Sequence, residues 1–198
     1  ASLREAVVSL DVAGLAVVVP SLAFVHGMRA SRKGLGHAVF GACLSAPLSD
    51  FRPRAIAGIL RSARVLKYED MDFWTLALQD VERSLANDLL SRDRYSWSTN
   101  NICEVALIVA RIIRDALAKS GDASSKVATT PFGTLDQTAS SALLPIASKV
   151  LRAAIDLASL RMSELDSHDL GILVTSLALS DVDDAIFFAL IAHRASHL

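Results

Sequence analysis

One pattern of residues occurs twice in this chain, first from Phe51 and again from Leu165, 114 positions later. Aligned without gaps, the two segments match apolar residues, one serine and a pair of aromatic residues. The matches are Phe51 with Leu165, Ile56 with Leu170, Ile59 and Leu60 with Leu173 and Val174, Ser62 with Ser176, and Phe73 and Trp74 with Phe187 and Phe188. Apolar residues three and four apart, then a polar break and an aromatic pair, predict a helix, a turn and a second helix.

Weaker versions of this unit are found along the rest of the chain. Their expected first residues are Leu10, Phe51, Trp97, Leu135 and Leu165. This series predicts an all-α fold of stacked helical hairpins, an α-solenoid with repeats of about 38 residues. A non-repetitive helical bundle is the alternative, because amphipathic helices share a period even where they are unrelated.

The periodicity also predicts where individual helices lie. We expect helices at about 10–25, 35–44 and 51–66, then a second helix that carries Phe73 and Trp74 and continues to about residue 90. Further helices are expected at about 102–118, 141–162 and 166–195, the last with a turn inside it. Asn101, three residues before Glu104, is an expected helix cap, and Ser180, three residues before Asp183, is another.

Composition favours one helical domain spanning residues 1–198. Hydrophobic residues make up 52% of the 198, which is ample for a continuous core. Residues 120–140 are rich in Ser, Thr, Ala and Gly and lack periodicity, so they predict a long flexible insertion or a functional loop. The longest apolar run, residues 12–25, contains Pro20 and falls short of the roughly 20 residues of a bilayer span, so no membrane span is expected.

Motifs for catalysis and for metal or cofactor binding are not found in the sequence. Glycine-rich nucleotide loops and the G-x-S-x-G nucleophile motif are absent. His193 and His197 are four residues apart, but no carboxylate joins them in a metal-binding pattern. Cys43 and Cys103 lack metal-ligand spacing and are expected in the core. We therefore expect a protein that is not an enzyme, with no catalytic residues, metal, cofactor or small-molecule substrate.

The clearest chemical signal is a basic stretch in the first copy of the repeated unit. Five basic residues and no acidic residue occur between positions 51 and 67, while the whole chain has a net charge of −1. A helical projection places Arg54 and Arg61 opposite the apolar face and Arg64 on its flank. Because the guanidinium fork binds phosphate bidentately, Arg54, Arg61 and Arg64 are the predicted RNA-binding residues.

The basic residues also have an alternative explanation, and the basic face is found in one unit only. The arginines could instead form a solvated face or pair with Glu69, Asp70, Asp72 and Asp80 of the same helical pair. The corresponding positions of the last unit hold His168 and Thr175, so the basic face is not repeated. The aromatic pairs Phe73/Trp74 and Phe187/Phe188 are expected to pack between helices and not to stack on bases.

The unit F-x-x-x-x-I-A-x-I-L-x-S-A-x-x-L, with its aromatic-bearing second helix, resembles the roughly 38-residue repeats of organellar RNA-associated proteins. These are octotricopeptide and heptatricopeptide repeats and the FAST-kinase-like group. The resemblance rests on residues 51–78 and 165–192, with weaker similarity at 10–25 and 135–150. The RAP domain that many of these proteins carry is not recognisable here, so nuclease-like activity is not implied.

The resemblance implies a mitochondrial location, or alternatively a plastid one. It further implies a non-catalytic role in an organellar ribonucleoprotein, as a structural subunit of the mitochondrial ribosome or as an RNA-binding factor. The expected partners are RNA, with ribosomal RNA foremost, and neighbouring proteins of a large assembly. The alternative is an armadillo- or HEAT-like protein-binding scaffold, or an accessory subunit of another organellar complex.

Overall fold

The computed structural model describes residues 10–27, 39–43, 51–66, 68, 70–91, 96–120 and 137–198. All regular secondary structure in these ranges is helical, which confirms the predicted all-α class. The elements are α2 (Val12–Gly27), α4 (Pro53–Val65), α5 (Met71–Leu90), α6 (Thr99–Ser120), α7 (Gln137–Leu160), the short 3-10 helix η2 (Met162–Glu164), α8 (Ser167–Ser180) and α9 (Ala185–Ala195). Residues 39–43 are also helical and lie within the helix expected at 35–44.

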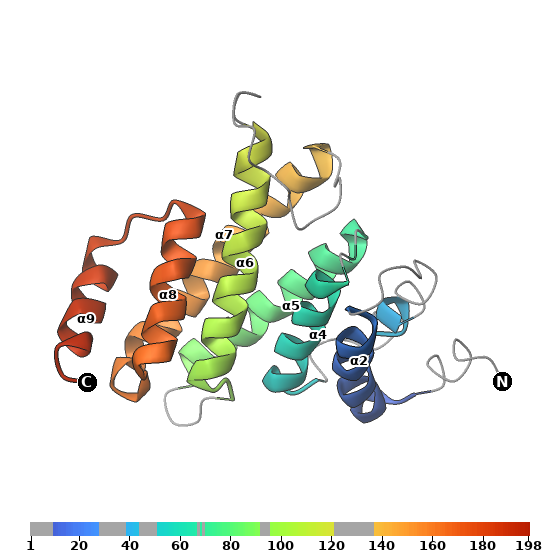
Figure 1. Cartoon of the computed structure of the whole chain (residues 1–198), viewed down its shortest axis with the longest axis horizontal. Coiled ribbons are helices and arrows are strands. Elements are labelled where there is room, and N and C mark those ends of the chain that lie inside the picture. The colour runs from blue at the N-terminus through green and yellow to red at the C-terminus, as the bar shows by residue number, and fades with distance from the viewer. Residues whose placement is uncertain are drawn as a thin grey trace.

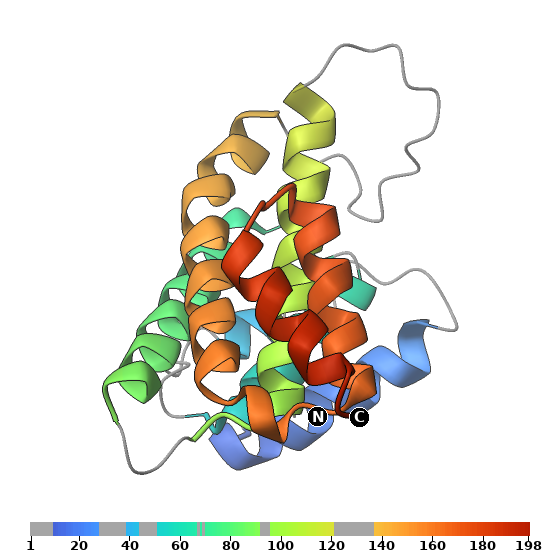
Figure 2. The ribbon, with the colours of Figure 1, turned by 90° about the vertical axis from the view of Figure 1, so that its left-hand side faces the viewer.

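The helices pack in two rows that follow the chain from one end of the molecule to the other (Figure 1). In the first row, α2 packs on α4, α4 on α6, and α6 on α8. In the second row, α5 packs on α7, and α7 on α9. Figure 2 looks along the stack and shows α5 and α7 on one side and α6 and α8 on the other. Contacts between α6 and α7 join the two rows.

Helix α6 is the most deeply enclosed element. From Asn101 to Ala116 every residue is buried except Glu104, Leu107, Arg111 and Arg114, which are partly buried. Their spacing of three, four and three places them on one narrow stripe of the helix. The remaining circumference, rich in Ile, Val and Ala, packs against α4, α7 and α8.

The two copies of the repeated unit have the same local structure. Ser62 and Ser176 are both buried, and each hydroxyl donates to the carbonyl oxygen four residues earlier, at 2.6 and 2.8 Å. Asp70 caps α5 and Asp184 caps α9, and each carboxylate accepts the backbone N–H three residues later at 3.0 Å. Matching residues therefore have matching local roles 114 positions apart.

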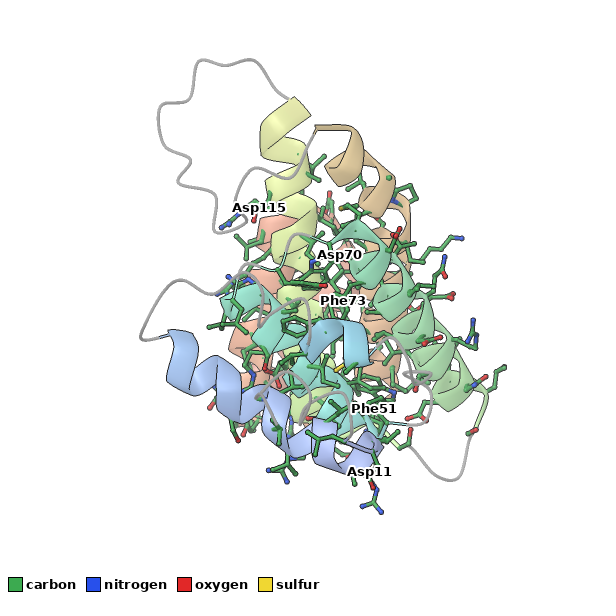
Figure 3. The ribbon with its side chains drawn as sticks, turned by 90° about the vertical axis from the view of Figure 1, so that its right-hand side faces the viewer. Asp11, Phe51, Asp70, Phe73 and Asp115 are labelled. Carbon is green, nitrogen blue, oxygen red and sulfur yellow. The ribbon has the colours of Figure 1, made fainter. Side chains whose placement is uncertain are left out.

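The core positions of the two copies also agree. Phe51 and Leu165 are buried two residues before α4 and α8 begin. Three further pairs are buried in both copies, namely Ile56 with Leu170, Ile59 with Leu173, and Phe73 with Phe187. Phe73 points into the molecule between α4 and α5 (Figure 3), where its ring lies 5.1 Å from that of Phe40.

Other matched positions differ in exposure. Leu60 and Trp74 are fully buried, whereas Val174 and Phe188 are 39% and 37% exposed. The cause is position in the stack: α6 packs on α4 and α7 on α5, while no described helix follows α8 and α9.

The prediction that a repeated unit starts at Leu135 is wrong. The helix that follows, α7, packs on α5 and α6 in the second row and is therefore the partner of α6. First-row helices begin at residues 12, 53, 99 and 167, so their intervals are unequal. Helix α7 already begins at Gln137, so residues 137–140 are helical, and the remainder of the predicted insertion, 121–136, lies outside the described residues.

Both predicted caps are also wrong. Asn101 is already inside α6, and its backbone N–H donates to the hydroxyl of Ser98 at 3.3 Å. Ser180 is the last residue of α8, and its hydroxyl donates to the carbonyl oxygens of Ser176 and Leu177. The spacing rule failed because several polar residues precede each helix, and the residue nearest to the helix start is the one that caps it.

The cysteine prediction is confirmed, since Cys43 and Cys103 are buried and free. Burial raises the pKa of the Cys43 thiol to about 12. Burial, with Asp169 adding to the effect, also raises the pKa of Cys103. Among the described helices, none has the length and apolar character needed to cross a membrane.

One buried carboxylate fixes the connection from α5 to α6. Asp88 accepts the backbone N–H groups of Ser96 and Trp97 at 2.7 and 2.9 Å, and the Ser96 hydroxyl at 2.7 Å. The Trp97 indole N–H donates to Ser84 at 2.9 Å, and the Trp97 carbonyl accepts from Arg161. These bonds tie the end of α5 and the end of α7 to the start of α6.

Replacing Asp88 should test this connection. Asp88→Ala leaves the buried Trp97 N–H and two donors of the exposed Ser96 without their acceptor, so the free energy of unfolding should fall by about 1–3 kcal/mol. Urea denaturation measures the change. Asn87→Ala, at the exposed neighbouring position, is the control and should change it by less than about 0.5 kcal/mol. Equal effects of the two variants would show that the Asp88 contacts do not stabilise the connection.

Truncation of Leu60 should show that α4 is held by its contacts with the rest of the first row. Leu60→Ala removes a fully buried side chain and should cost about 2–5 kcal/mol of unfolding free energy. Val65→Ala in the same helix removes an exposed side chain and should cost less than about 1 kcal/mol. Thermal unfolding followed by circular dichroism compares the two, and a small loss for Leu60→Ala would contradict the packing.

Candidate nucleic-acid interface

Helix α4 leaves only a thin strip of its surface in water. Seven of its residues are buried, and Arg54, Arg61 and Val65 are its exposed ones. Arg64 is partly buried on the flank facing α6. The positions of Arg54, Arg61 and Arg64 relative to the core are therefore those that the helical projection predicts.

Arg61 binds a carboxylate of the next first-row helix. Its Nη2 donates to Glu104 Oε2 at 2.9 Å, and its Nε contacts the other oxygen of the same carboxylate. The Arg61 side chain is 62% exposed, so this ion pair contributes only about 0–1 kcal/mol to stability.

Two of the carboxylates of the same helical pair that were expected to bind the arginines make other contacts. Asp70 caps α5, and Asp80 pairs with Arg83 at 2.9 Å. Glu69 lies outside the described residues. In the described part of the chain the ion pair of Arg61 is with Glu104 of α6 and not with Asp70 or Asp80.

Arg64 lies in an unusually cationic environment. Its neighbours on α6 are Arg111, Arg114 and Asp115. Burial lowers the pKa of Arg64, and the charges of Arg111 and Arg114 lower it further, while Asp115 opposes the shift. The Arg64 Nε atom is buried and has no hydrogen-bond partner among the described residues.

Asp115 of α6 is the carboxylate beside Arg64, Arg111 and Arg114 among the described residues. Its Oδ1 accepts from Nε and Nη2 of Arg114 at 3.0 and 2.7 Å. Its other oxygen is buried without a hydrogen-bond partner in the described part of the chain. Figure 3 shows Asp115 at the edge of the first row, away from α5 and α7.

Together these side chains form what we call the arginine surface, on the outer side of α4 and α6. It contains Arg54, Arg61, Arg64, Arg111 and Arg114, with Glu104 and Asp115. Five guanidinium groups face two carboxylates, so the surface carries three more positive than negative charges. Such a local excess attracts an anionic partner even when the chain as a whole is nearly neutral.

Sequence reasoning missed Arg111 and Arg114. Both interrupt an otherwise apolar helix, and with Glu104 and Leu107 they have helical spacing. That spacing is the signal from which they were identifiable. Lys67, the last basic residue of the stretch between positions 51 and 67, lies outside the described residues, as do Arg29, Arg32 and Lys33.

The aromatic pair of α5 packs inside the protein, as predicted. The Trp74 indole N–H donates to the Tyr68 carbonyl at 2.7 Å, and the Phe73 and Trp74 rings meet edge to face at 5.5 Å.

The rings of His193 and His197 lie 4.8 Å apart. Within the described ranges no group of three or more His, Cys, Asp or Glu side chains is arranged to hold a metal ion.

Comparison of the chain with protein-family models, curated proteins and solved structures gives no match. The arginine surface is therefore the main chemical indication of function.

The charge balance of the arginine surface gives a stability prediction. Asp115→Asn removes the buried counter-charge of three neighbouring arginines and should lower the free energy of unfolding by about 1–3 kcal/mol. Added salt should reduce this loss, because it screens repulsion between the arginines. Urea denaturation at low and high salt measures both effects.

Glu104→Gln is the matched control on the same helix. It removes one partner of an exposed ion pair and should change the free energy of unfolding by at most about 1 kcal/mol. If Asp115→Asn were as mild as Glu104→Gln, Asp115 would not balance the arginines.

Proposed function

We propose that this chain is a non-catalytic helical-repeat protein that binds RNA through the arginine surface of α4 and α6. The observation that carries the proposal is the excess of arginine on that surface, five guanidinium groups against two carboxylates. Phosphate contacts supply most of the sequence-independent affinity for nucleic acids, and arginine makes them bidentately.

The placement of the arginines suits an extended phosphate backbone. Arg54 and Arg61 are seven residues apart, which is about 10 Å along the axis of α4. Arg64, Arg111 and Arg114 extend the positive charge towards and along α6. Arg64 is partly desolvated, which strengthens its attraction for an anion that replaces water there. A single RNA strand crossing from α4 to α6 satisfies these groups better than a single small anion does.

We further propose that the two rows are a short α-solenoid of helical pairs whose lengths along the chain are unequal. The alternation of first-row and second-row helices supports this, as do the shared caps and core positions 114 residues apart. In such a stack the outer faces of equivalent helices lie side by side. His168 and Thr175 replace the arginines in the last unit, so the proposed RNA site is confined to α4 and α6.

The sequence resemblance at residues 51–78 and 165–192 extends the proposal to an organelle. On this basis the protein belongs to a mitochondrial or plastid ribonucleoprotein, as an RNA-binding factor or as a structural subunit of the mitochondrial ribosome, with ribosomal RNA as its RNA. A surface with both arginines and carboxylates suits a subunit that contacts RNA and protein together.

A protein-binding scaffold of the armadillo or HEAT type is the second candidate. The exposed apolar side chains of α8 and α9, among them Val174, Ile186 and Phe188, favour it. The two candidates differ in their response to salt, since apolar contacts are nearly insensitive to it and phosphate contacts are not.

Fluorescence anisotropy with a labelled single-stranded RNA of mixed sequence tests the RNA proposal. The association constant should fall steeply as salt rises, and the log–log slope should lose about 0.7 for each phosphate contact removed by Arg61→Gln or Arg114→Gln. Glu104→Gln should strengthen binding, because it removes a negative charge and releases Arg61.

Arg83→Gln provides the control, since Arg83 is an exposed, ion-paired arginine of α5 in the second row. It should leave the salt slope unchanged. Binding that does not depend on salt, or an equal loss with Arg83→Gln and Arg61→Gln, would contradict an RNA site on the arginine surface.

A further inference from the structure

The α8–α9 end of the molecule exposes positions that are covered in the α4–α5 pair. Five matched positions are buried in α4 and α5 but exposed in α8 and α9: Ala57 and Gly171, Leu60 and Val174, Trp74 and Phe188, Leu78 and Ala192, and Val81 and Ala195. Helix α6 packs on α4 and α7 packs on α5, whereas no described helix follows α8 and α9. We call Gly171, Val174, Phe188, Ala192 and Ala195 the end face.

The end face has the chemistry of a covered surface. The end of a helical stack that meets water needs polar residues on its outer side. Each of the five residues is smaller than its match in the α4–α5 pair, yet none is polar. Residues 170–180 of α8 and 185–192 of α9 contain no charged side chain at all. A helix that is apolar around most of its circumference is normally buried, so the end face calls for a partner.

The contacts of the α4–α5 pair indicate what kind of partner fits the end face. A pair of helices, α6 and α7, packs on α4 and α5. A surface of the same geometry on α8 and α9 therefore fits another pair of helices. The α8–α9 pair of a second copy is such a pair, and it offers an uncharged apolar face of the same extent. Contact between two end faces is symmetric and closed. It therefore produces a dimer and does not continue into a longer chain of copies.

The charges at the two ends of α9 also favour a second copy as the partner, and they predict how it is oriented. Exposed Asp181 and Asp183 precede the helix, while exposed His193 and His197 lie at its other end, beside Arg194, whose guanidinium donates to the Leu165 carbonyl. A two-fold axis across the helices runs α9 antiparallel to its copy, so the acidic turn of one chain faces the basic end of the other. The helix dipoles are then antiparallel too.

We propose that the end face binds the end face of a second copy of this chain. The resulting dimer has α8 and α9 of each protomer packed on α8 and α9 of the other. The arginine surface lies on α4 and α6, so it stays open on both protomers.

Sedimentation velocity of the full chain over a wide range of concentrations tests this dimer. The expected result is a monomer–dimer equilibrium that ends at the dimer mass. Ala192→Glu should raise the dissociation constant about 100-fold or more, because symmetry places the charge in the contact twice. Ala192 is exposed, so this substitution does not disturb the core, and Phe188→Glu provides a second variant within the end face.

Ile186→Glu is the matched control on the same helix. Ile186 is 77% exposed on the opposite flank of α9, and its match in α5 is the exposed acid Asp72. This variant should still form the dimer, and circular dichroism should show the same helix content in all the variants. A wild-type protein that stays monomeric, a series of oligomers that grows beyond the dimer, or a dimer that survives both Ala192→Glu and Phe188→Glu would each overturn the proposal.

Discussion

The burial of α6 is the constraint on which the rest of the structure depends. This helix packs on α4, α7 and α8, and over residues 101–116 it leaves only the stripe of Glu104, Leu107, Arg111 and Arg114 partly open. Charge is tolerated on α6 at that stripe because it adjoins α4 and not the core. Arg61 and Arg64 of α4 face the same stripe, so the arginine surface follows directly from how α6 is enclosed. The hydrogen bonds of Asp88 then fix where α6 begins.

Much of the local structure was predictable, because a helical pair with the same caps and core must keep the same residue spacing. The offset of 114 residues correctly matched buried Ile56 with Leu170 and Ser62 with Ser176. It also matched the position of the aromatic residue that follows each aspartate cap. Periodicity gave the helical class, and the absence of metal-ligand spacing identified Cys43 and Cys103 as core residues. Projection of α4 placed Arg54 and Arg61 on its water-facing side.

The remaining features depend on contacts between distant parts of the chain. Periodicity identifies a helix but not its row, so it predicts a new unit from Leu135, whereas α7 is the partner of α6. Arg61 pairs with Glu104, 43 residues away, and no local pattern distinguishes that carboxylate from the nearer ones. Asp88 is a buried acid at the end of a helix, and only the folded connection explains its burial. Arg111 and Arg114 gain their significance from the neighbouring α4, which the sequence of α6 does not reveal.

Arginine footprinting tests the central claim, that RNA binds the arginine surface, most directly. The protein is treated with a dicarbonyl reagent with and without a single-stranded RNA, and mass spectrometry measures the modification of each arginine. The account predicts that RNA protects Arg54, Arg61 and Arg114, while Arg83 and Arg152, which are exposed on second-row helices, stay reactive. Equal modification with and without RNA, or protection confined to Arg83 and Arg152, would contradict it.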